Sequence, residues 1–375
     1  MKILQVNIDN KGAGGAYVLI HNIQKVLEKK NSTIKFDFLT MDKFDSNRDN
    51  FPTSDSRLFE LNLRKNRLLG HLKLPFIIYK IFKNNPYDVV HIHSDSAWKI
   101  CLYYFPARIA KVKNIIFHAH STGLDGDCKI IKIISHHIGH YLLKNAQGSA
   151  IACSSDAAKF VFGTKFLRSH KYLILKNGIE VSKFKFSQKK REKFRKKYGL
   201  ENAFIVGNTS KVCFAKNPEF LVEVFYELKK INRNAKLLFI GNVDKEYYKI
   251  IEKLISKKKL NNDILFLGFT NNVSEILSAL DYFVFPSRFE GLGISLIEAQ
   301  ANGLPCIVSE GIPDLAVTSK KTIKLSVSSG AKKWAEVILR DHERNKFGIN
   351  EVQQNGFDIL DTAKVLEEIY KKYEA

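Results

Sequence analysis

The sequence DYFVFPSRFEGLGISLIEAQANGLPCIV, residues 281–308, contains the pattern that decides the fold. It begins with a short apolar run, Tyr282–Phe285, and ends with another, Cys306–Val308. Between the two runs, a glycine-rich turn leads into a helical stretch that ends at Gly303. A strand, a helix and a further strand in this order build parallel sheets that helices cover on both faces. The segment therefore predicts an α/β fold.

The same alternation continues on both sides of this segment. Expected strands fall into two series, which lie at 3–8, 34–39, 89–93, 114–118, 148–153 and 172–175, and at 204–208, 236–240, 264–267, 282–285 and 306–308. A length of 375 residues suits two domains of ordinary size. We therefore expect two doubly wound, Rossmann-like domains, residues 1–180 and 181–350. Because ligands bind at the carboxyl ends of such strands, the active site is expected in the cleft between the domains.

Lysine and arginine outnumber the acidic residues by 60 to 38, which gives a formal net charge of +22. This excess favours anionic partners such as nucleic acid, lipid headgroups or phosphorylated substrates, although an AT-rich genome that favours lysine codons would also produce it. The five cysteines form no CxxC pair, which favours a reducing cytoplasm and argues against a zinc site. The first residues do not resemble a signal peptide, and no apolar run reaches the ~18 residues of a membrane span.

The first turn between a strand and a helix, residues 10–17, contains Gly12, Gly14 and Gly15. Glycines leave backbone amides accessible at a helix N-terminus, which is a place for an anion. Tyr17 replaces the third glycine of the dinucleotide-binding motif, so that motif is not present. A phosphate or sugar contact and a merely flexible turn both remain open.

Two of the expected strands end in paired histidines, His91 with His93 and His118 with His120. Alternation along a strand places the two imidazoles of each pair on one side. No further ligands stand at the spacing of a metal site, so we predict no metal centre. We expect His120 to bind a sugar or to shuttle a proton, and the other three histidines to have structural roles.

Two other groupings have ordinary explanations. His136 and His140 stand one helical turn apart, but no glutamate completes an H-E-x-x-H motif. Asp125, Gly126 and Asp127 resemble a D-x-D metal site, but acid–glycine–acid is also a common loop composition. For the acidic grouping we favour the loop, and for the histidines the motif of a metal site is incomplete.

Two lysines follow a strand of the second series. Lys211 and Lys216 lie after residues 204–208 and before a helix that opens at Pro218. Two cations beside a helix N-terminus suit a diphosphate. Solvated side chains are the alternative in a chain this rich in lysine.

Two glutamates, Glu290 and Glu298, stand on either side of the glycine-rich turn. Glu290 is placed to accept hydrogen bonds from hydroxyls, and Glu298 lies about one and a half turns inside the helix. Such carboxylates can bind two diols at opposite ends of one elongated ligand. The amides between them suit phosphate or sugar oxygens; they belong to Gly291, Leu292, Gly293 and Ile294. The alternative is one glutamate favoured by the helix dipole and one ordinary exposed glutamate.

The run PSRFEGLGISLIEAQANGLPCIVS, residues 286–309, resembles the E-x7-E region of the family 4 glycosyltransferases, retaining enzymes of the GT-B fold. Similar segments occur along nearly the whole chain, namely GGA at 14–16, YDVVHIH at 87–93, HAH at 118–120, KNGIE at 176–180, GNTSKVCFAKN at 207–217 and LFLG at 265–268. The branch that the chain most resembles makes bacterial capsule and exopolysaccharide. We also expect a C-terminal helix, within 351–375, that crosses back to the N-terminal domain.

The resemblance implies a role for each matching residue. Glu298 would bind the ribose of a nucleotide, Glu290 would contact the donor sugar near the reacting carbon, and His120 would meet that sugar from the N-terminal domain. The remaining donor contacts would come from Lys211 and Lys216 at the diphosphate, the amides of Gly291, Leu292, Gly293 and Ile294, the first loop at Gly15 and Ala16, and Phe269 near the base. The family usually has glycine-arginine where this chain has Ser210 and Lys211, so the bidentate fork of arginine is lost.

The implied reaction moves a hexosyl unit from a UDP-sugar to an acceptor hydroxyl with the anomeric configuration retained and without a cofactor or metal. The implied acceptor is a lipid-diphosphate-linked glycan, and the implied location is the cytoplasm or the inner face of the plasma membrane. Residues 63–83 mix six lysines or arginines with large apolar residues, which predicts either a membrane-binding patch or an ordinary amphipathic helix. Open alternatives are a protein or other glycan acceptor, a nucleotide-sugar phosphorylase or epimerase, and a basic nucleic-acid-binding protein without a recognisable binding module.

Overall fold

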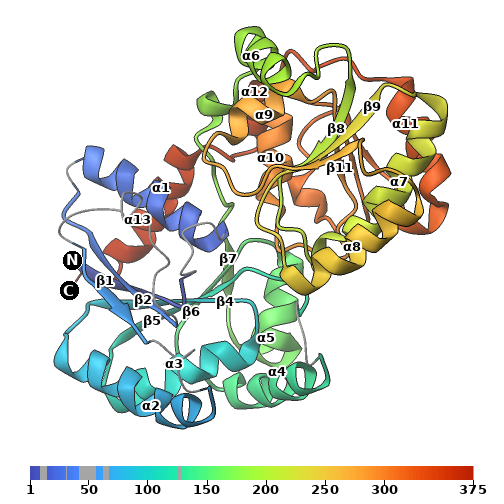
Figure 1. Ribbon diagram of the computed structural model, residues 1–375. Coiled ribbons are helices and arrows are strands. Elements are labelled where there is room, and N and C mark those ends of the chain that lie inside the picture. Colours follow the sequence, from blue (N-terminus) through green and yellow to red (C-terminus); the bar gives the residue numbers. More distant parts are fainter. Residues whose placement is uncertain (9–14, 31, 42–55, 62–66, 125–128, 375) are drawn as a thin grey trace. The chain divides into compact units, whose positions relative to one another are not determined.

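The computed structural model describes residues 1–8, 15–30, 32–41, 56–61, 67–124 and 129–374. The chain forms two compact units (Figure 1). The N-terminal unit comprises Met1–Gly178 together with Ile359–Ala375, and the C-terminal unit comprises Ile179–Asp358. The chain therefore returns to the N-terminal unit for its last helix.

The N-terminal unit is built on a parallel sheet of seven strands in the order β3-β2-β1-β4-β5-β6-β7. The strands are β1 (Lys2–Val6), β2 (Lys35–Thr40), β3 (Leu58–Glu60), β4 (Val89–Ser94), β5 (Asn114–Ala119), β6 (Ser149–Ala152) and β7 (Tyr172–Ile174). The central strands are buried on both faces, and their buried positions include the polar residues Gln5, His91 and His93 beside the apolar ones.

Helices cover both faces of this sheet. On one face, α1 (Gly15–Lys29) packs beside the last helix, α13 (Ile359–Lys371) (Figure 1). Their apolar sides form one core with the sheet, to which Leu19, Ile23 and Leu366 belong. The other face carries α2 (Arg67–Asn84), α3 (Ala97–Ile109), α4 (Lys129–Leu143) and α5 (Ser155–Ser169).

The C-terminal unit repeats the architecture with six parallel strands in the order β10-β9-β8-β11-β12-β13. These are β8 (Phe204–Asn208), β9 (Ala235–Phe239), β10 (Ile264–Phe266), β11 (Tyr282–Phe285), β12 (Cys306–Val308) and β13 (Thr322–Lys324). One face packs around the buried Trp334 against α7 (Pro218–Ile231), α8 (Lys245–Lys257) and α11 (Ala331–Arg340). The helices on the other side are α6 (Gln188–Tyr198), α9 (Val273–Ala279), α10 (Ile294–Ala301) and α12 (Gly348–Gln354).

The predicted fold class is confirmed, and the segment at 281–308 is the β11-α10-β12 unit. Its two strands are parallel neighbours, with Val284 opposite Ile307. Two edge strands, β3 and β13, were not predicted, because three residues are too few to show a pattern. None of the helices that the structure describes combines the length and the apolar composition needed to cross a lipid bilayer.

Candidate functional site

In the C-terminal unit, the loop that joins β11 to α10 is held by close backbone packing. Gly311, which follows β12, passes so near this loop that an added Cβ would lie 2.3 Å from the carbonyl oxygen of Ser287. The amide of Glu290 donates to the carbonyl of Gly311 at 3.1 Å, and Ser309 Oγ donates to the carbonyl of Ser287 at 2.5 Å. The loop is therefore shaped by the protein itself before any ligand binds.

Glu290 and Lys216 form an ion pair at the centre of this loop. Glu290 is buried, and its Oε1 also accepts a hydrogen bond from Ser287 Oγ at 2.8 Å. Lys216 comes from the short 3-10 helix η4 (Phe214–Lys216), and its Nζ lies 5.6 Å from the centre of the Phe285 ring. The structure thus brings together two predicted site residues that are 74 positions apart in the sequence.

Lys211 has a different partner. Its Nζ lies 3.8 Å from Asp244 Oδ2 at the start of α8, and about half of its side chain is exposed. A long contact of this kind between exposed groups contributes little stability, so the side chain can reorient at small cost. Lys211 and Lys216 therefore follow the same strand, as predicted, but they are held by different groups.

Glu298 projects from the middle of α10 and is half-buried. Burial raises the pKa of its carboxyl to about 7, against a smaller lowering by Lys183. Within the part of the chain that the structure describes, this carboxyl has neither a hydrogen-bond nor an ion-pair partner. A desolvated carboxyl without a partner is a candidate for binding a ligand.

The start of α10 lies between these two glutamates. Gly293 caps the helix with a positive φ of 94°, a conformation that favours glycine. The amides of Leu292, Gly293 and Ile294 have no acceptor among the described residues, while Gly291 is buried in the preceding loop. The helix dipole places partial positive charge at these amides, so this end of α10 favours an anion.

Two contacts that the sequence did not reveal connect this site to the loop after β8. Ser295 Oγ donates to the carbonyl of Thr209 at 2.7 Å. Gly241, after β9, has a φ of 136°, and an added Cβ would lie 2.6 Å from the carbonyl oxygen of Ser210. Gly241 follows an apolar strand directly, and that position is the signal that could have identified it. Phe269, which lies beyond β10, is half-exposed.

Arg288 stands two residues before Glu290 but has a structural role. Its guanidinium pairs with Glu219 and donates to the carbonyl of Phe214 at 2.6 Å. It also lies 4.3 Å from the centre of the Phe214 ring. These contacts fasten the β11-α10 loop to η4, which carries Lys216.

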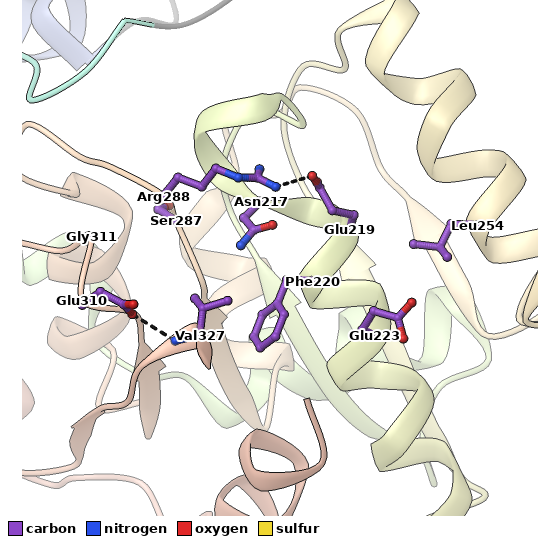
Figure 2. Close-up of a pocket in the computed structure, with 10 residues that line it drawn as sticks. All are labelled: Asn217, Glu219, Phe220, Glu223, Leu254, Ser287, Arg288, Glu310, Gly311 and Val327. Carbon is purple, nitrogen blue, oxygen red and sulfur yellow. Dashed lines mark hydrogen bonds and ion pairs between the residues drawn. The ribbon is translucent and has the colours of Figure 1, made fainter. Parts of the chain in front are cut away.

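A cavity of about 670 Å³ adjoins Ser287 and Arg288 (Figure 2). Its lining residues are Asn217, Glu219, Phe220, Glu223, Leu254, Ser287, Arg288, Glu310, Gly311 and Val327. Figure 2 shows Arg288 paired with Glu219, and Glu310 bonded to the backbone of Val327. None of the predicted site residues lines this cavity, and two of its three glutamates are already paired with cations, Glu219 with Arg288 and Glu223 with Lys258. The cavity is therefore distinct from the candidate site.

In the N-terminal unit, the two predicted histidine pairs meet in one cluster. Ring centroids lie 4.3 Å apart for His91 and His93, and 4.0 Å apart for His118 and His120. His93 is directly opposite His118 in the pairing of β4 with β5, and His93 Nδ1 lies 2.8 Å from His120 Nε2. The prediction placed each pair on one side of its strand, but it did not foresee that the pairs join.

Burial keeps these imidazoles neutral. It lowers the pKa of His120 to about 4, against a small opposing effect of Asp95, and it lowers the pKa of His91 to about 3. The ring nitrogens of His91, His93 and His118 lie within 4.8 Å of one another, so these residues could hold a metal ion. Both nitrogens of His93 already have partners, however, and a metal would have to displace one of them. The absence of a metal stays a prediction.

The remaining predicted residues lie at the start of α1, in loops and on α4. Gly15, exposed, and Ala16, half-buried, begin α1. The other predicted positions in loops, Gly12, Gly14, Asp125, Gly126 and Asp127, lie outside the described residues. The other histidine pair, His136 and His140, is structural: both rings contact the carbonyl of Phe160, at 3.0 and 2.9 Å.

Residues 190–348 match the family model of the glycosyl transferases group 1. A protein of Bacillus subtilis with the name "Putative glycosyltransferase EpsF" is 27% identical over 98% of this chain and 96% of its own length. The capsular polysaccharide biosynthesis glycosyltransferase CapH of Staphylococcus aureus is 30% identical over 79% of this chain and 80% of its own. The UDP-Gal:alpha-D-GlcNAc-diphosphoundecaprenol alpha-1,3-galactosyltransferase of Escherichia coli is 26% identical over 78% and 76%.

A solved structure shares the fold over the full length. HepE of Anabaena, crystallised in complex with UDP-glucose, matches with a TM-score of 0.79 and 17% identity over 99% of this chain and 100% of its own. The likeness supports the fold of each parallel-sheet unit, and CapH supplies the sequence relationship. The chain therefore belongs to the glycosyl transferases group 1 and is a glycosyltransferase of the GT-B fold.

Proposed function

We propose that the chain is a retaining, family 4 hexosyltransferase that uses a UDP-sugar and acts in the synthesis of a surface polysaccharide. The observation that carries this proposal is the Lys216–Glu290 pair beside the start of α10, together with the carboxyl of Glu298 on that helix, which has no partner among the described residues. HepE was crystallised with UDP-glucose, and the E. coli relative is named for a UDP-galactose donor. Both names favour a UDP-linked hexose as the donor here.

The C-terminal unit has groups suited to each part of such a donor. Glu298 would bind the ribose hydroxyls, and Lys211 and Lys216 would neutralise the diphosphate. The amides at the start of α10 would add donors to the phosphate and sugar oxygens. Glu290 would orient the sugar hydroxyls, since Lys216 and Ser287 already fix its carboxylate. Phe269 would lie near the base, and the start of α1 at Gly15 and Ala16 would line the donor.

The reaction would break the bond between the anomeric carbon and the diphosphate oxygen. The bonding electrons leave with the diphosphate, where the lysines and the amides of α10 stabilise the developing charge. The acceptor hydroxyl attacks from the face that the diphosphate leaves, and its proton passes to a phosphate oxygen. The configuration at the anomeric carbon is thereby retained, without a covalent enzyme intermediate and without a metal. His120 would contact the donor sugar.

The first experiment measures UDP release from a panel of UDP-sugars, with a membrane lipid extract and without added metal. The native chain and Glu298→Ala are compared, with the exposed Glu252→Ala as the matched control. We expect one sugar to support release, and Glu298→Ala to reduce release at least tenfold while the control does not. Absence of binding and release with UDP-, GDP- and dTDP-sugars alike would overturn the proposal.

We further propose a lipid-diphosphate-linked glycan as the acceptor and a peripheral location on the inner face of the membrane. The E. coli relative is named for such an acceptor. The helices α2, α3 and α4 contain eight lysines or arginines and no aspartate or glutamate. Of the predicted patch at 63–83, residues 63–66 lie outside the described part; α2 buries Leu74 and Ile78 in the fold and exposes Phe76.

The most exposed apolar surface of these helices is on α4. Ile130, Ile131 and Ile134 are 75%, 68% and 55% exposed, and Lys132 stands among them. The opposite side of α4 packs closely, because an added Cβ on Gly139 would lie 2.4 Å from the amide nitrogen of Trp98. An exposed apolar surface on a helix whose sequence contains two lysines and no aspartate or glutamate suits an anionic lipid surface.

Vesicle flotation tests this surface. The native chain should bind vesicles that contain phosphatidylglycerol and should not bind pure phosphatidylcholine. The double variant Ile131→Asp/Ile134→Asp should bind at least tenfold more weakly, because it removes apolar area and adds negative charge. The matched control is Ile231→Asp/Ile250→Asp, which changes two exposed isoleucines of the C-terminal unit. Equal binding by both double variants would contradict the assignment to α4.

A further inference from the structure

A continuous chain of hydrogen bonds runs from His120 to the last helix. His120 Nε2 lies 2.8 Å from His93 Nδ1, and His93 Nε2 lies 2.8 Å from Gln5 Oε1. Gln5 Nε2 donates to Tyr370 Oη at 3.0 Å, and Tyr370 Oη lies 2.7 Å from His91 Nδ1. The chain therefore links the ends of β4 and β5 through β1 to α13.

The side chains that form this series of hydrogen bonds are neutral. Gln5, His91, His93 and Tyr370 are almost completely buried. Burial lowers the pKa of His93 well below its usual range and raises that of the Tyr370 hydroxyl. A neutral imidazole has one N–H and one nitrogen lone pair, so a bond at one nitrogen decides what the other can do.

The side-chain amide of Gln5 determines which atom donates in each of these hydrogen bonds. Gln5 Oε1 can only accept, so His93 Nε2 must carry the proton and His93 Nδ1 must accept. His120 Nε2 is then the donor to His93, which leaves the lone pair on His120 Nδ1. At the other end, the Tyr370 hydroxyl oxygen accepts a hydrogen bond from Gln5 Nε2, and the hydroxyl donates to His91 Nδ1.

Turning the Gln5 amide over would reverse every bond. Gln5 Nε2 would donate to His93 Nε2, His93 Nδ1 would donate to His120 Nε2, and His120 Nδ1 would carry the proton. The same imidazole would then offer a donor in place of an acceptor. His120 is half-buried, and its Nδ1 has no partner among the described residues. This nitrogen is therefore the group whose character the chain controls.

We propose that Gln5 and Tyr370 are positioning residues that fix the tautomer of His120, so that its Nδ1 accepts a hydrogen bond from a hydroxyl of the donor sugar. The inference rests on the proposed function, in which His120 contacts that sugar. It extends that function to two residues that touch no substrate and that stand 365 positions apart in the sequence. It also gives the return of the chain to the N-terminal unit a role in catalysis, because Tyr370 is on α13.

The test uses the full chain labelled with 15N-histidine. Long-range 1H–15N spectra distinguish an imidazole protonated at Nε2 from one protonated at Nδ1, and His120→Ala assigns the signal. We expect the native His120 to be protonated at Nε2. In Gln5→Leu and Tyr370→Phe the signal should shift toward a mixture of tautomers. Gln5→Glu keeps an acceptor for His93, so it should restore the native tautomer.

Kinetics provide the second measurement. In Gln5→Leu and Tyr370→Phe, kcat should fall about tenfold, as expected for one misdirected hydrogen bond. UDP binding should stay within twofold, since the groups proposed to bind UDP lie in the C-terminal unit. Gln24→Leu and Tyr103→Phe are matched controls, because they remove another buried amide and another buried hydroxyl from the same unit. These controls should leave both the tautomer and kcat unchanged.

The outcomes separate this inference from the proposed function. If the Nε2 tautomer persists in Gln5→Leu, or if the native His120 is protonated at Nδ1, the inference is wrong even when the chain transfers sugar. If no UDP-sugar is used but the tautomer still depends on Gln5, the proposed function is wrong and the control of the tautomer stands. Stoichiometric zinc in the purified chain, with loss of the His91, His93 and His118 signals, would make the cluster a metal centre and overturn the inference.

Discussion

The two units of this chain gather polar side chains at the carboxyl ends of parallel strands, but they treat charge in opposite ways. In the N-terminal unit, the rings of four histidines pack against one another, and burial holds them neutral. In the C-terminal unit, Lys216 and Glu290 are paired as ions, and Glu298 titrates near neutral pH. The same architecture therefore holds a neutral hydrogen-bonded cluster at one sheet and a charged cluster at the other.

Under the proposed function, each unit would suit a different part of the donor. A sugar is an array of hydroxyls, and neutral imidazoles can hydrogen-bond to it without the cost of burying a charge. A diphosphate develops negative charge as it leaves, so it needs cations and helix-start amides that are fixed beforehand. Substitutions that exchange these properties should damage each unit in its own way.

The largest effect is expected from Lys216→Ala. The change removes the cation that is paired with the buried carboxylate of Glu290, and it removes a cation proposed for the diphosphate. We expect kcat/KM to fall about 10³-fold in UDP-release assays, in the range measured when one stabilising donor is lost. Lys258→Ala is the matched control, since its Nζ pairs with Glu223 at 2.7 Å elsewhere in the same unit. A loss below tenfold would remove Lys216 from the mechanism.

A smaller loss is expected from Gly311→Ala, which tests whether the charged site depends on its backbone. The added Cβ would meet the carbonyl oxygens of Ser287 and Arg288, at 2.3 and 2.6 Å, so the loop that carries Glu290 must move. We expect about 10²-fold lower kcat and a free energy of unfolding lower by about 2 kcal/mol. Gly199→Ala is the control: its φ of 64° is strained for alanine, but nothing lies within 4 Å. It should cost about 1 kcal/mol of stability and leave kcat unchanged.

Glu298 provides a test by pH. Its pKa is raised from 4.5 to about 7 in the fold, so the folded chain binds more protons than the unfolded chain between these values. Stability should therefore fall as the pH rises from about 4.5 to 7, by up to about 3 kcal/mol, and then level off. Glu298→Gln should remove this slope in urea unfolding measured at pH 5 and pH 8, whereas the exposed Glu252→Gln should keep it. An unchanged slope in Glu298→Gln would show that the Glu298 carboxyl is not desolvated.

Much of the fold could be predicted because many strands and helices show a recognisable pattern in their own sequence. The runs at β8 and β11 were predicted with their observed bounds, and α7 begins and ends as expected. The edge strands β3 and β13 escaped because three residues carry no period. Parallel pairing is set by contacts between distant segments, so no local pattern could show that β4 lies beside β5.

The candidate site was predictable in its members but not in its contacts. Glu290 and Glu298 stand in a dense motif, and a motif identifies residue types without their partners. The pairing of Lys216 with Glu290, and the chain from His120 to Tyr370, join segments that meet only after folding. Gly311 was not predicted, because it matters only through the close approach of the Ser287 carbonyl, which leaves no room for a side chain.

The smallest expected effect comes from Lys211→Arg, which tests whether Lys211 belongs to the charged site of the C-terminal unit. Lys211 is half-exposed and weakly held by Asp244, so an arginine has room to adopt a new orientation. Its planar fork can bind a phosphate with two parallel hydrogen bonds, whereas the lysine acts as a point charge. We expect UDP to bind about threefold more tightly by calorimetry, a gain of about 0.6 kcal/mol. Lys245→Arg, an exposed neighbour on α8, is the control and should not change UDP affinity. Tighter UDP binding by both variants would indicate a general effect of guanidinium groups. Unchanged UDP affinity in both would place Lys211 away from the diphosphate.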